Sequence, residues 1–392
     1  SQAPLLRVAI ADIKGEGLLL LIDMHHIISD GVSHSILEQD FARLYSGEDL
    51  APLKLQYKDF SEWQNSKEQQ EKIKRHEEYW LKQFEGEVPI LSLPTDYIRP
   101  AMQSFEGASV SFSLSKEETE GLKSFTKEND LTLYMSVLSV FNILLSKLSG
   151  QEDIIVGTPI AGRNHVDLEH IVGVFVNTLA IRNDVNVGDS LKSFISRLKD
   201  VTLEAFENQD YQFEDLVDKV SVERDISRNP LFDVMFNLLN QTEYSGDLSG
   251  LGRDKYLHVP GISKFDLTLS AVDYGDQLLL SFEYCTKLFK AETIERYIVY
   301  FKQIVVQLSR KPESKISDID ILTKEEKQEL LHEFNATKVD YPKDKTILKL
   351  FEEQVEKTPD NIVLVFGDES ISYSELNKKS DNIASYLLSQ GV

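Results

Sequence analysis

The sequence predicts an α/β fold with mixed sheets and more than one folding unit. Segments with the period-two pattern of strands, such as ASVSFSLS at 108–115, alternate with segments of helical spacing, such as SKEETEGLKSFTKEND at 115–130. The length of 392 residues suggests two or three domains. Contents of 41% hydrophobic and 27% charged residues are typical of a soluble globular protein.

The first part of the chain predicts two strands followed by helices. LLRVAIADI (5–13) and GLLLLIDMHH (17–26) are joined by a KGEG turn. The second strand is apolar almost throughout, so we expect it to be central and covered on both faces. Helical spacing follows at 33–47 and at 66–84. The proline-containing stretch PILSLPTDYIRP (89–100) is then expected to connect two lobes on the surface.

The middle of the chain predicts the main α/β body. The apolar segment 131–148 is expected to be a buried helix closed by Gly150. Further helices are predicted at 190–209 and 291–310, and strands are predicted within 153–160, 175–185, 231–240 and 264–285.

The composition changes to a polar linker after Arg310. This linker holds a short helix opened by a capping box from Thr323 to Glu326. Beyond it, the pattern predicts helix, strand, strand and helix, as at the start of a further domain. The first residue is Ser1 and the last, Val392, follows an unfinished helix pattern. We therefore expect the chain to be a piece of something longer at both ends.

The charge balance disfavours two classes of partner. With 42 basic and 65 acidic residues, the formal net charge is -23, which repels nucleic acid and anionic membrane surfaces. The single cysteine fits a cytoplasmic protein. No signal peptide is visible, and the apolar segment 131–148 is interrupted and shorter than the ~20 residues of a membrane span.

The segment HHIISDG (25–31) is the first candidate for chemistry. Neighbouring side chains of a strand point to opposite faces, so we expect one of His25 and His26 to face a channel or cleft and the other to pack or hydrogen-bond in the body. This geometry argues against a metal site. Asp30 lies across a turn that Gly31 permits. Either this group performs general base chemistry, or the histidines are ordinary residues and Asp30 caps the next helix.

HHIISDG resembles the HHxxxDG signature of condensation domains in nonribosomal peptide synthetases and, more distantly, the chloramphenicol acetyltransferase-like acyltransferases. Further segments resemble that family's motifs in the family's order: YKDFSEW (57–63), GTPIAGR (157–163), IVGVFVNTLAIR (171–182), NQDYQFE (208–214) and RDISRNPLF (224–232). Asn208 and Gln212 depart from the usual histidine and proline of the fourth pattern.

These motif residues also have structural interpretations. Tyr57, Asp59 and Trp63 are expected to belong to a packed helix, with the aromatic side chains on one stripe. For Asn177 and Thr178, backbone hydrogen bonding and the lining of a substrate channel both remain open. The remaining group is expected to tie down a loop before a strand: Asp225, Arg228 and Asn229.

The resemblance implies two chloramphenicol acetyltransferase-like lobes, the first incomplete, with a tunnel between them. Upstream and downstream carrier domains would present thioesters on phosphopantetheine arms, no cofactor or metal would be bound directly, and His26 would serve the reaction as a base or a positioning group. It also implies that the arginine partner of Asp30 lies before Ser1, so that Asp30 has no such partner in this chain. ISYSELN (371–377) resembles the first core motif of adenylation domains.

The resemblance divides the chain into four parts. These are the first lobe with its HHxxxDG motif at 1–100, the second lobe at 101–310, a linker at 311–345 and the start of an adenylation domain at 346–392. The alternatives are an epimerisation domain, an acyltransferase that uses coenzyme A, and a non-catalytic remnant that docks carriers. The downstream segment disfavours the first two, and the intact HHxxxDG residues disfavour the last.

Overall fold

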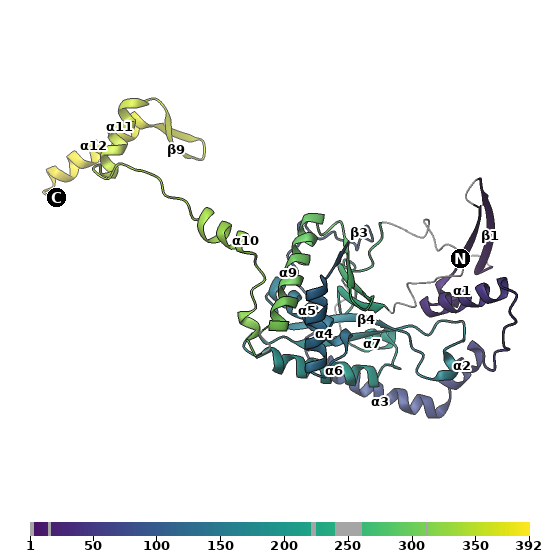
Figure 1. The fold of residues 1–392 in the computed structure, drawn as a ribbon. Helices are drawn as coiled ribbons and strands as arrows, with labels where there is room; N and C mark the ends of the chain where they lie inside the picture. Colours follow the sequence, from purple (N-terminus) through teal and green to yellow (C-terminus); the bar gives the residue numbers. More distant parts are fainter. Residues whose placement is uncertain (1–3, 15–16, 221–224, 240–260, 311–312) are drawn as a thin grey trace. The chain divides into compact units, whose positions relative to one another are not determined.

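The structure is a computed structural model that describes residues 4–14, 17–220, 225–239, 261–310 and 313–392. It separates into two compact units, Ser1–Thr323 and Lys324–Val392 (Figure 1). The centre of the KGEG turn, the first residue of RDISRNPLF, the end of the strand predicted to reach residue 240 and the start of the predicted linker lie outside the described residues.

A six-stranded mixed sheet organises the first unit. Strand β6 is parallel to β4 and to β7, and the other neighbours are antiparallel. The predicted mixed sheet is therefore confirmed. In spatial order the strands are β3 (Gly107–Ser113), β8 (Leu278–Cys285), β7 (Leu267–Asp273), β6 (Val234–Leu239), β4 (Asp153–Ile160) and β5 (Asn177–Asp184).

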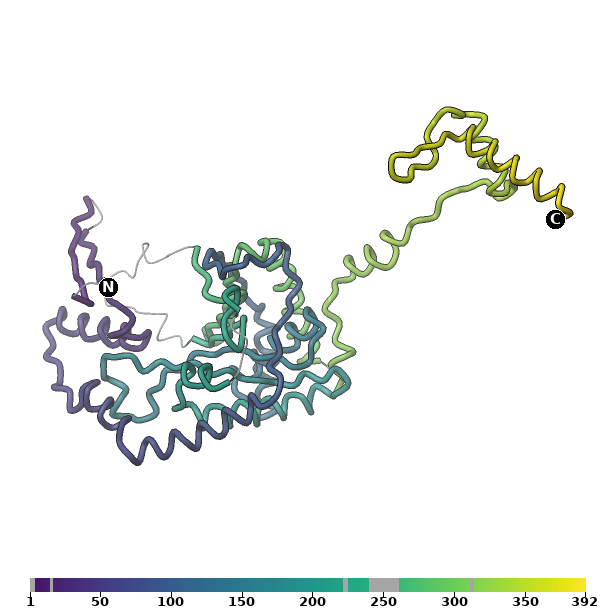
Figure 2. The backbone as a smooth tube through the Cα atoms, turned by 180° about the vertical axis from the view of Figure 1, so that it is seen from behind, coloured from purple at the N-terminus to yellow at the C-terminus, as the bar shows by residue number. Residues whose placement is uncertain are grey.

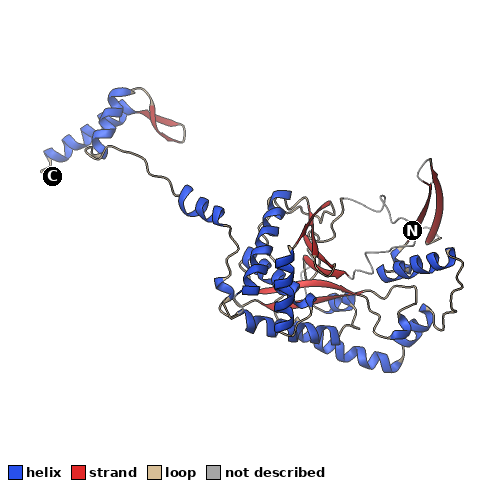
Figure 3. Ribbon diagram, in the orientation of Figure 1, coloured by secondary structure: helices blue, strands red, loops and turns tan. Residues whose placement is uncertain are grey.

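Helices cover this sheet (Figure 3). Helix α5 packs on β4, α6 on β5 and α9 on β3, while α4 packs along α9. Helix α5 is buried over most of its length, as predicted, and ends at Gly150 with φ +72°, a conformation that glycine adopts without strain. The bounds are α4 (Lys116–Glu128), α5 (Leu133–Ser149), α6 (Leu191–Glu207), α7 (Phe213–Lys219) and α9 (Ala291–Arg310).

The described residues that precede the six-stranded sheet in the sequence form a hairpin, β1 and β2, followed by helices α1 to α3. Helix α3 runs alongside α7 and so connects these elements with the part of the chain that contains the sheet (Figure 2). The indole of Trp80 on α3 donates to the carbonyl of Asn208 at 2.8 Å. The elements are β1 (Leu6–Ile13), β2 (Gly17–Met24), α1 (Gly31–Tyr45), α2 (Tyr57–Gln64) and α3 (Lys67–Gln83).

The prediction that the apolar second strand is central and covered is wrong. Within the described part of the chain, strand β2 pairs with β1 alone, and Leu18 and Ile22 are 76% and 51% exposed. An apolar sequence makes burial of a strand favourable, but the strand is buried only where other elements pack against it. In the structure, most residues of β2 remain exposed.

The second unit follows the predicted order of helix, strand, strand and helix. After the short α10 (Lys324–Gln328), it contains α11 (Ile347–Lys357), β9 (Ile362–Phe366), β10 (Glu369–Ser372) and α12 (Tyr373–Ser389). Ser372 and Glu375 form a reciprocal capping box at the start of α12. Glu375 therefore stabilises the start of this helix.

Candidate functional site

The HHIISDG segment is an exposed turn that follows β2. The strand ends at Met24, and a short 3₁₀ turn spans His26–Ile28. The Nδ1 atom of His25 accepts a hydrogen bond from the amide of Ile27 at 3.1 Å. Both histidines are exposed, so neither packs in the body, and His25 shows the other expected outcome, a hydrogen bond to the backbone. Side chains alternate only inside a strand, and this strand stops before the histidines.

Asp30 is the buried anchor of the same turn, at 3% exposure. Its Oδ1 caps α1 by accepting from the amide of Ser33 at 2.8 Å, and its Oδ2 accepts from the amide of Phe175 at 3.0 Å. Burial raises the pKa of this carboxyl, but the bonds from Phe175 and Ser33 together with the charge of Arg163 outweigh it and lower the pKa. Asp30 is therefore both a helix cap and a link to the second lobe.

Asp30 has an arginine partner within this chain, at a position other than the one that the resemblance implied. Arg163, in the loop after β4, approaches Oδ1 of Asp30 at 3.1 Å, and the two side chains are 5% and 2% exposed. The same guanidinium donates to the carbonyls of Leu168 and Ile171 at 2.6 Å and lies 4.1 Å from the ring centre of Phe175. This partner comes from later in the chain, in the GTPIAGR segment.

Ser33 completes the buried contact, and its role was missed in the sequence. Its hydroxyl lies 2.7 Å from Oδ1 of Asp30 and 2.8 Å from the carbonyl oxygen of Gly173. It also accepts from the amide of Gly173 and from Arg163, both at 3.0 Å. A serine two residues after the DG pair was the available signal.

Gly31 does not play the role expected of it. It is the first residue of α1, its φ is not positive, and a Cβ there would meet no described atom within 4 Å. The 3₁₀ turn and the Asp30 cap make the change of direction, so the backbone does not require glycine. Gly173, by contrast, lies so close to Tyr57 that a Cβ would be 2.0 Å from the ring.

The two channel candidates lie at the start of β5 and behave differently. Asn177 is 6% exposed and donates to the carbonyls of Gln209 and Tyr211 at 2.9 and 2.7 Å. Its Oδ1 accepts from the amides of Thr178 and Phe213 at 2.8 and 3.1 Å. These bonds use the full capacity of an amide side chain. Asn177 therefore connects the start of β5 with the backbone of residues 209–213. Thr178 is half-buried.

Helix α2 carries the YKDFSEW residues against the same region. The hydroxyl of Tyr57 donates to the carbonyl of Val174 at 2.8 Å, and its ring meets Phe175 edge-on at 5.2 Å between centres. Asp59 accepts from the amide of Gln56 and closes a capping box. Trp63 is half exposed, so it adds less packing than the predicted stripe suggested.

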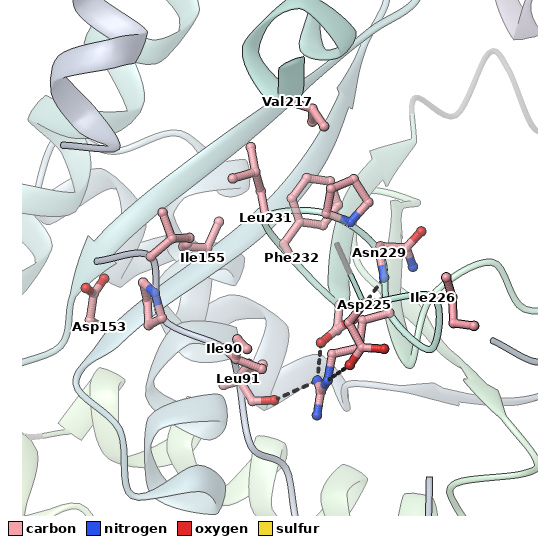
Figure 4. A pocket seen from close by; sticks show the side chains of 15 residues that line it. Ile90, Leu91, Asp153, Ile155, Val217, Asp225, Ile226, Asn229, Leu231 and Phe232 are labelled. Atoms are coloured by element: carbon pink, nitrogen blue, oxygen red, sulfur yellow. Dashed lines mark hydrogen bonds and ion pairs between the residues drawn. The ribbon is translucent and has the colours of Figure 1, made fainter. Parts of the chain in front are cut away.

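Residues 225–232 of the RDISRNPLF segment form a loop before β6, as predicted. Asp225 accepts from the amide of Ser227 at 2.8 Å, Arg228 pairs with Asp233, and the Asn229 side chain donates to the carbonyl of Lys264 at 3.0 Å. These residues line one end of a cavity of about 410 Å³, whose remaining wall is mostly apolar (Figure 4). His26 does not line this cavity.

The described part of the chain was also expected to hold no metal and no membrane span, and two observations bear on this. No group of three or more His, Cys, Asp or Glu side chains there could hold a metal ion. No single helix in that part of the chain is long and apolar enough to cross a membrane; α4 and α5 would meet the length and composition only as a pair, and they are bent by 108°.

A comparison with protein families matches residues 1–331 to the condensation domain model. The chain belongs to the condensation domain family. Gramicidin S synthase 2 of Brevibacillus brevis is 48% identical over the whole chain, and bacitracin synthase 3 of Bacillus licheniformis is 45% identical. The chain spans only 9% and 6% of these two proteins.

Solved structures show the same fold. A holo four-domain nonribosomal peptide synthetase bound to AMP and glycine matches this condensation domain with a TM-score of 0.76 and 24% identity, over 100% of this chain and 31% of that one. The first condensation domain of the CDA synthetase matches with a TM-score of 0.64 and 18% identity, over 81% of this chain and 70% of that one. The predicted α/β fold and its family are confirmed.

Proposed function

We propose that this condensation domain forms a peptide bond between two thioesters presented by carrier domains. The amine of the acceptor aminoacyl group attacks the carbonyl carbon of the donor. A C–N bond forms, the C–S bond breaks, the thiolate leaves on the donor's phosphopantetheine arm, and the amine loses a proton. The observation that carries the proposal is the exposed imidazole of His26. It lies on a turn that is anchored by Asp30, whose buried carboxylate bonds to the second lobe.

Positioning by His26 is expected to contribute more than proton transfer. Holding reactants in a productive orientation can supply about 7–11 kcal/mol. General base catalysis typically gives about 10²–10⁴-fold, or roughly 3–5 kcal/mol. A thioester already reacts with an unprotonated amine, so a hydrogen bond that orients the amine has the larger effect.

The second unit is proposed to be the start of an adenylation domain. Its support is the ISYSELN segment, which spans the end of β10 and the start of α12, and the match of the whole chain to peptide synthetases. The division into lobes at 1–100 and 101–310, a linker at 311–345 and this start at 346–392 is part of the same proposal. So are a cytoplasmic location and partnership with carrier domains on either side.

The test replaces His26 in the complete natural protein and supplies donor- and acceptor-loaded carriers. His26→Ala is expected to lower product formation at least about 100-fold, as read by mass spectrometry, without a change in melting temperature. His332→Ala is the matched control, because His332 is also an exposed histidine and lies outside the loop that contacts Asp30. A His26→Ala protein as active as the control would refute the proposal.

A further inference from the structure

The buried anchor of the histidine turn belongs to a closed ring of contacts. One arm runs from Asp30 to Arg163, and the next residue, Asn164, donates to Oδ1 of Asp210 at 2.6 Å. The other arm runs from Asp30 to the amide of Phe175, and Asn177, two residues on, donates to the carbonyls on either side of Asp210. We call this set the Asp30 ring: Asp30, Arg163, Asn164, Phe175, Asn177 and Asp210.

The two arms of the Asp30 ring, one through Arg163 and one through Phe175, pack closely against each other. Gly162 has φ +64°, and a Cβ there would lie 1.9 Å from the carbonyl oxygen of Phe175. The guanidinium of Arg163 covers the Phe175 ring at 4.1 Å. Packing at this density cannot absorb a displacement of one arm without moving the other. A shift at Asp210 is therefore passed to Asp30.

The ring also reaches a third element, helix α3. Lys72 approaches Oδ2 of Asp210 at 2.6 Å, on the other side of the carboxylate from Asn164. Further along α3, Trp80 donates to the carbonyl of Asn208, two residues before Asp210. Asp210 is thus the point at which α3, the loop after β4 and the turn after α6 meet.

We propose that Asp210 is a positioning residue for the histidine turn. By holding Asn164 and Lys72 together, it fixes the loop that carries Arg163 and, through Asp30, the direction in which the turn presents His26. This proposal rests on the function proposed above, because it concerns the reaction that His26 serves. It gives the NQDYQFE segment a role at a distance from the substrate.

The experiment compares two lysine–aspartate pairs of the complete natural protein. Asp210→Ala removes the carboxylate that joins Asn164 and Lys72, whereas Asp273→Ala removes the partner of Lys123, a 2.8 Å pair outside the ring. Asp210→Ala is expected to lower kcat about tenfold, with KM for both loaded carriers within about twofold, since a misplacement of ~1 Å can cost up to ~100-fold. Asp273→Ala should leave both constants within about twofold.

Two readouts separate positioning from a general loss of stability. Hydrogen exchange of the amides of Ser33, Gly173 and Phe175, which bond to Asp30 or Ser33, should speed up in Asp210→Ala and not in Asp273→Ala. The double variant Asn164→Asp, Asp210→Asn restores the hydrogen bond between these two positions with donor and acceptor swapped. This double variant should recover most of the turnover that Asp210→Ala loses.

Three results would overturn the proposal: unchanged exchange at these amides in Asp210→Ala, unchanged kcat, or equal losses in Asp210→Ala and Asp273→Ala. Failure of the proposed function is a different outcome, because it would show as no condensation product from the natural protein with any loaded carrier. The exchange measurement does not depend on turnover, so it would still decide whether Asp210 is coupled to the turn.

Discussion

Strands β2 and β8 have similar apolar sequences and opposite environments. GLLLLIDM in β2 is largely exposed, whereas LLLSFEYC in β8 lies between β3 and β7 under the helices and alternates between buried and half-buried residues. Composition sets how much burial a strand needs, and the neighbouring elements decide whether it is met. The same contrast applies to the regions around these strands. The six-stranded sheet is stabilised by apolar packing, whereas the turn after β2 is attached to the second lobe by polar contacts of Asp30.

The largest expected effect is the loss of a core aromatic side chain. Phe282 in β8 is fully buried, and Phe282→Ala should lower the free energy of unfolding by about 3–5 kcal/mol because it leaves a cavity. Ile22→Ala in β2 should change it by less than about 1 kcal/mol, since Ile22 is half exposed. Urea unfolding measures both, and equal losses would contradict the contrast between the strands.

The next effect concerns the polar contact that attaches the histidine turn to the second lobe. Arg163→Met leaves the carboxylate of Asp30 buried without its cation, which should cost about 3 kcal/mol of unfolding free energy. Lys123→Met, which breaks a half-exposed pair with Asp273, should cost less than about 1 kcal/mol. A loss for Arg163→Met no larger than the control's would show that the turn is held by other contacts.

A third prediction follows from the lowered pKa of Asp30. Because its folded-state pKa lies below the ordinary value of 3.8, the ionised carboxylate stabilises the fold above that value, and this stability is lost as the pH falls through the folded-state pKa. Asp30→Asn removes the titration. Its unfolding free energy should therefore depend less on pH below about pH 4 than that of the natural protein, and parallel curves would contradict the assignment.

The smallest effect on stability is expected at the exposed hairpin. Val8 and Ile22 face each other across β1 and β2, and they are 58% and 51% exposed. Ile22→Lys should reduce binding of a hydrophobic dye and aggregation of the 392-residue chain, with a change of at most about 0.5 kcal/mol in stability. Unchanged dye binding would mean that the hairpin is covered in solution.

Local signals in the sequence were sufficient for most of the fold. The apolar helix before Gly150, the capping box at Ser372 and the alternation in β3 each depend on residues close together in the chain. The exposure of β2 could not be predicted in this way, because burial of a strand depends on which elements reach it.

The site was predictable in its motifs and unpredictable in its connections. His26 and Asp30 stood out in the sequence, but Arg163 bonds to Asp30 across 133 residues. Asn177 was left between two roles because its partners are the carbonyls of Gln209 and Tyr211, and a backbone carbonyl has no signature in a sequence. Contacts of this kind require the folded arrangement.

The pairing of Asp30 with Arg163 has a consequence for synthetase engineering. A chimera whose crossover falls between these positions takes Asp30 from one parent and Arg163 from the other. The contact between Ser33 and Gly173 is then also made by residues of different parents. Splice points placed before the hairpin or after the turn at Asp210 keep the set from one parent. Recombination within that interval should give more inactive hybrids than recombination outside it.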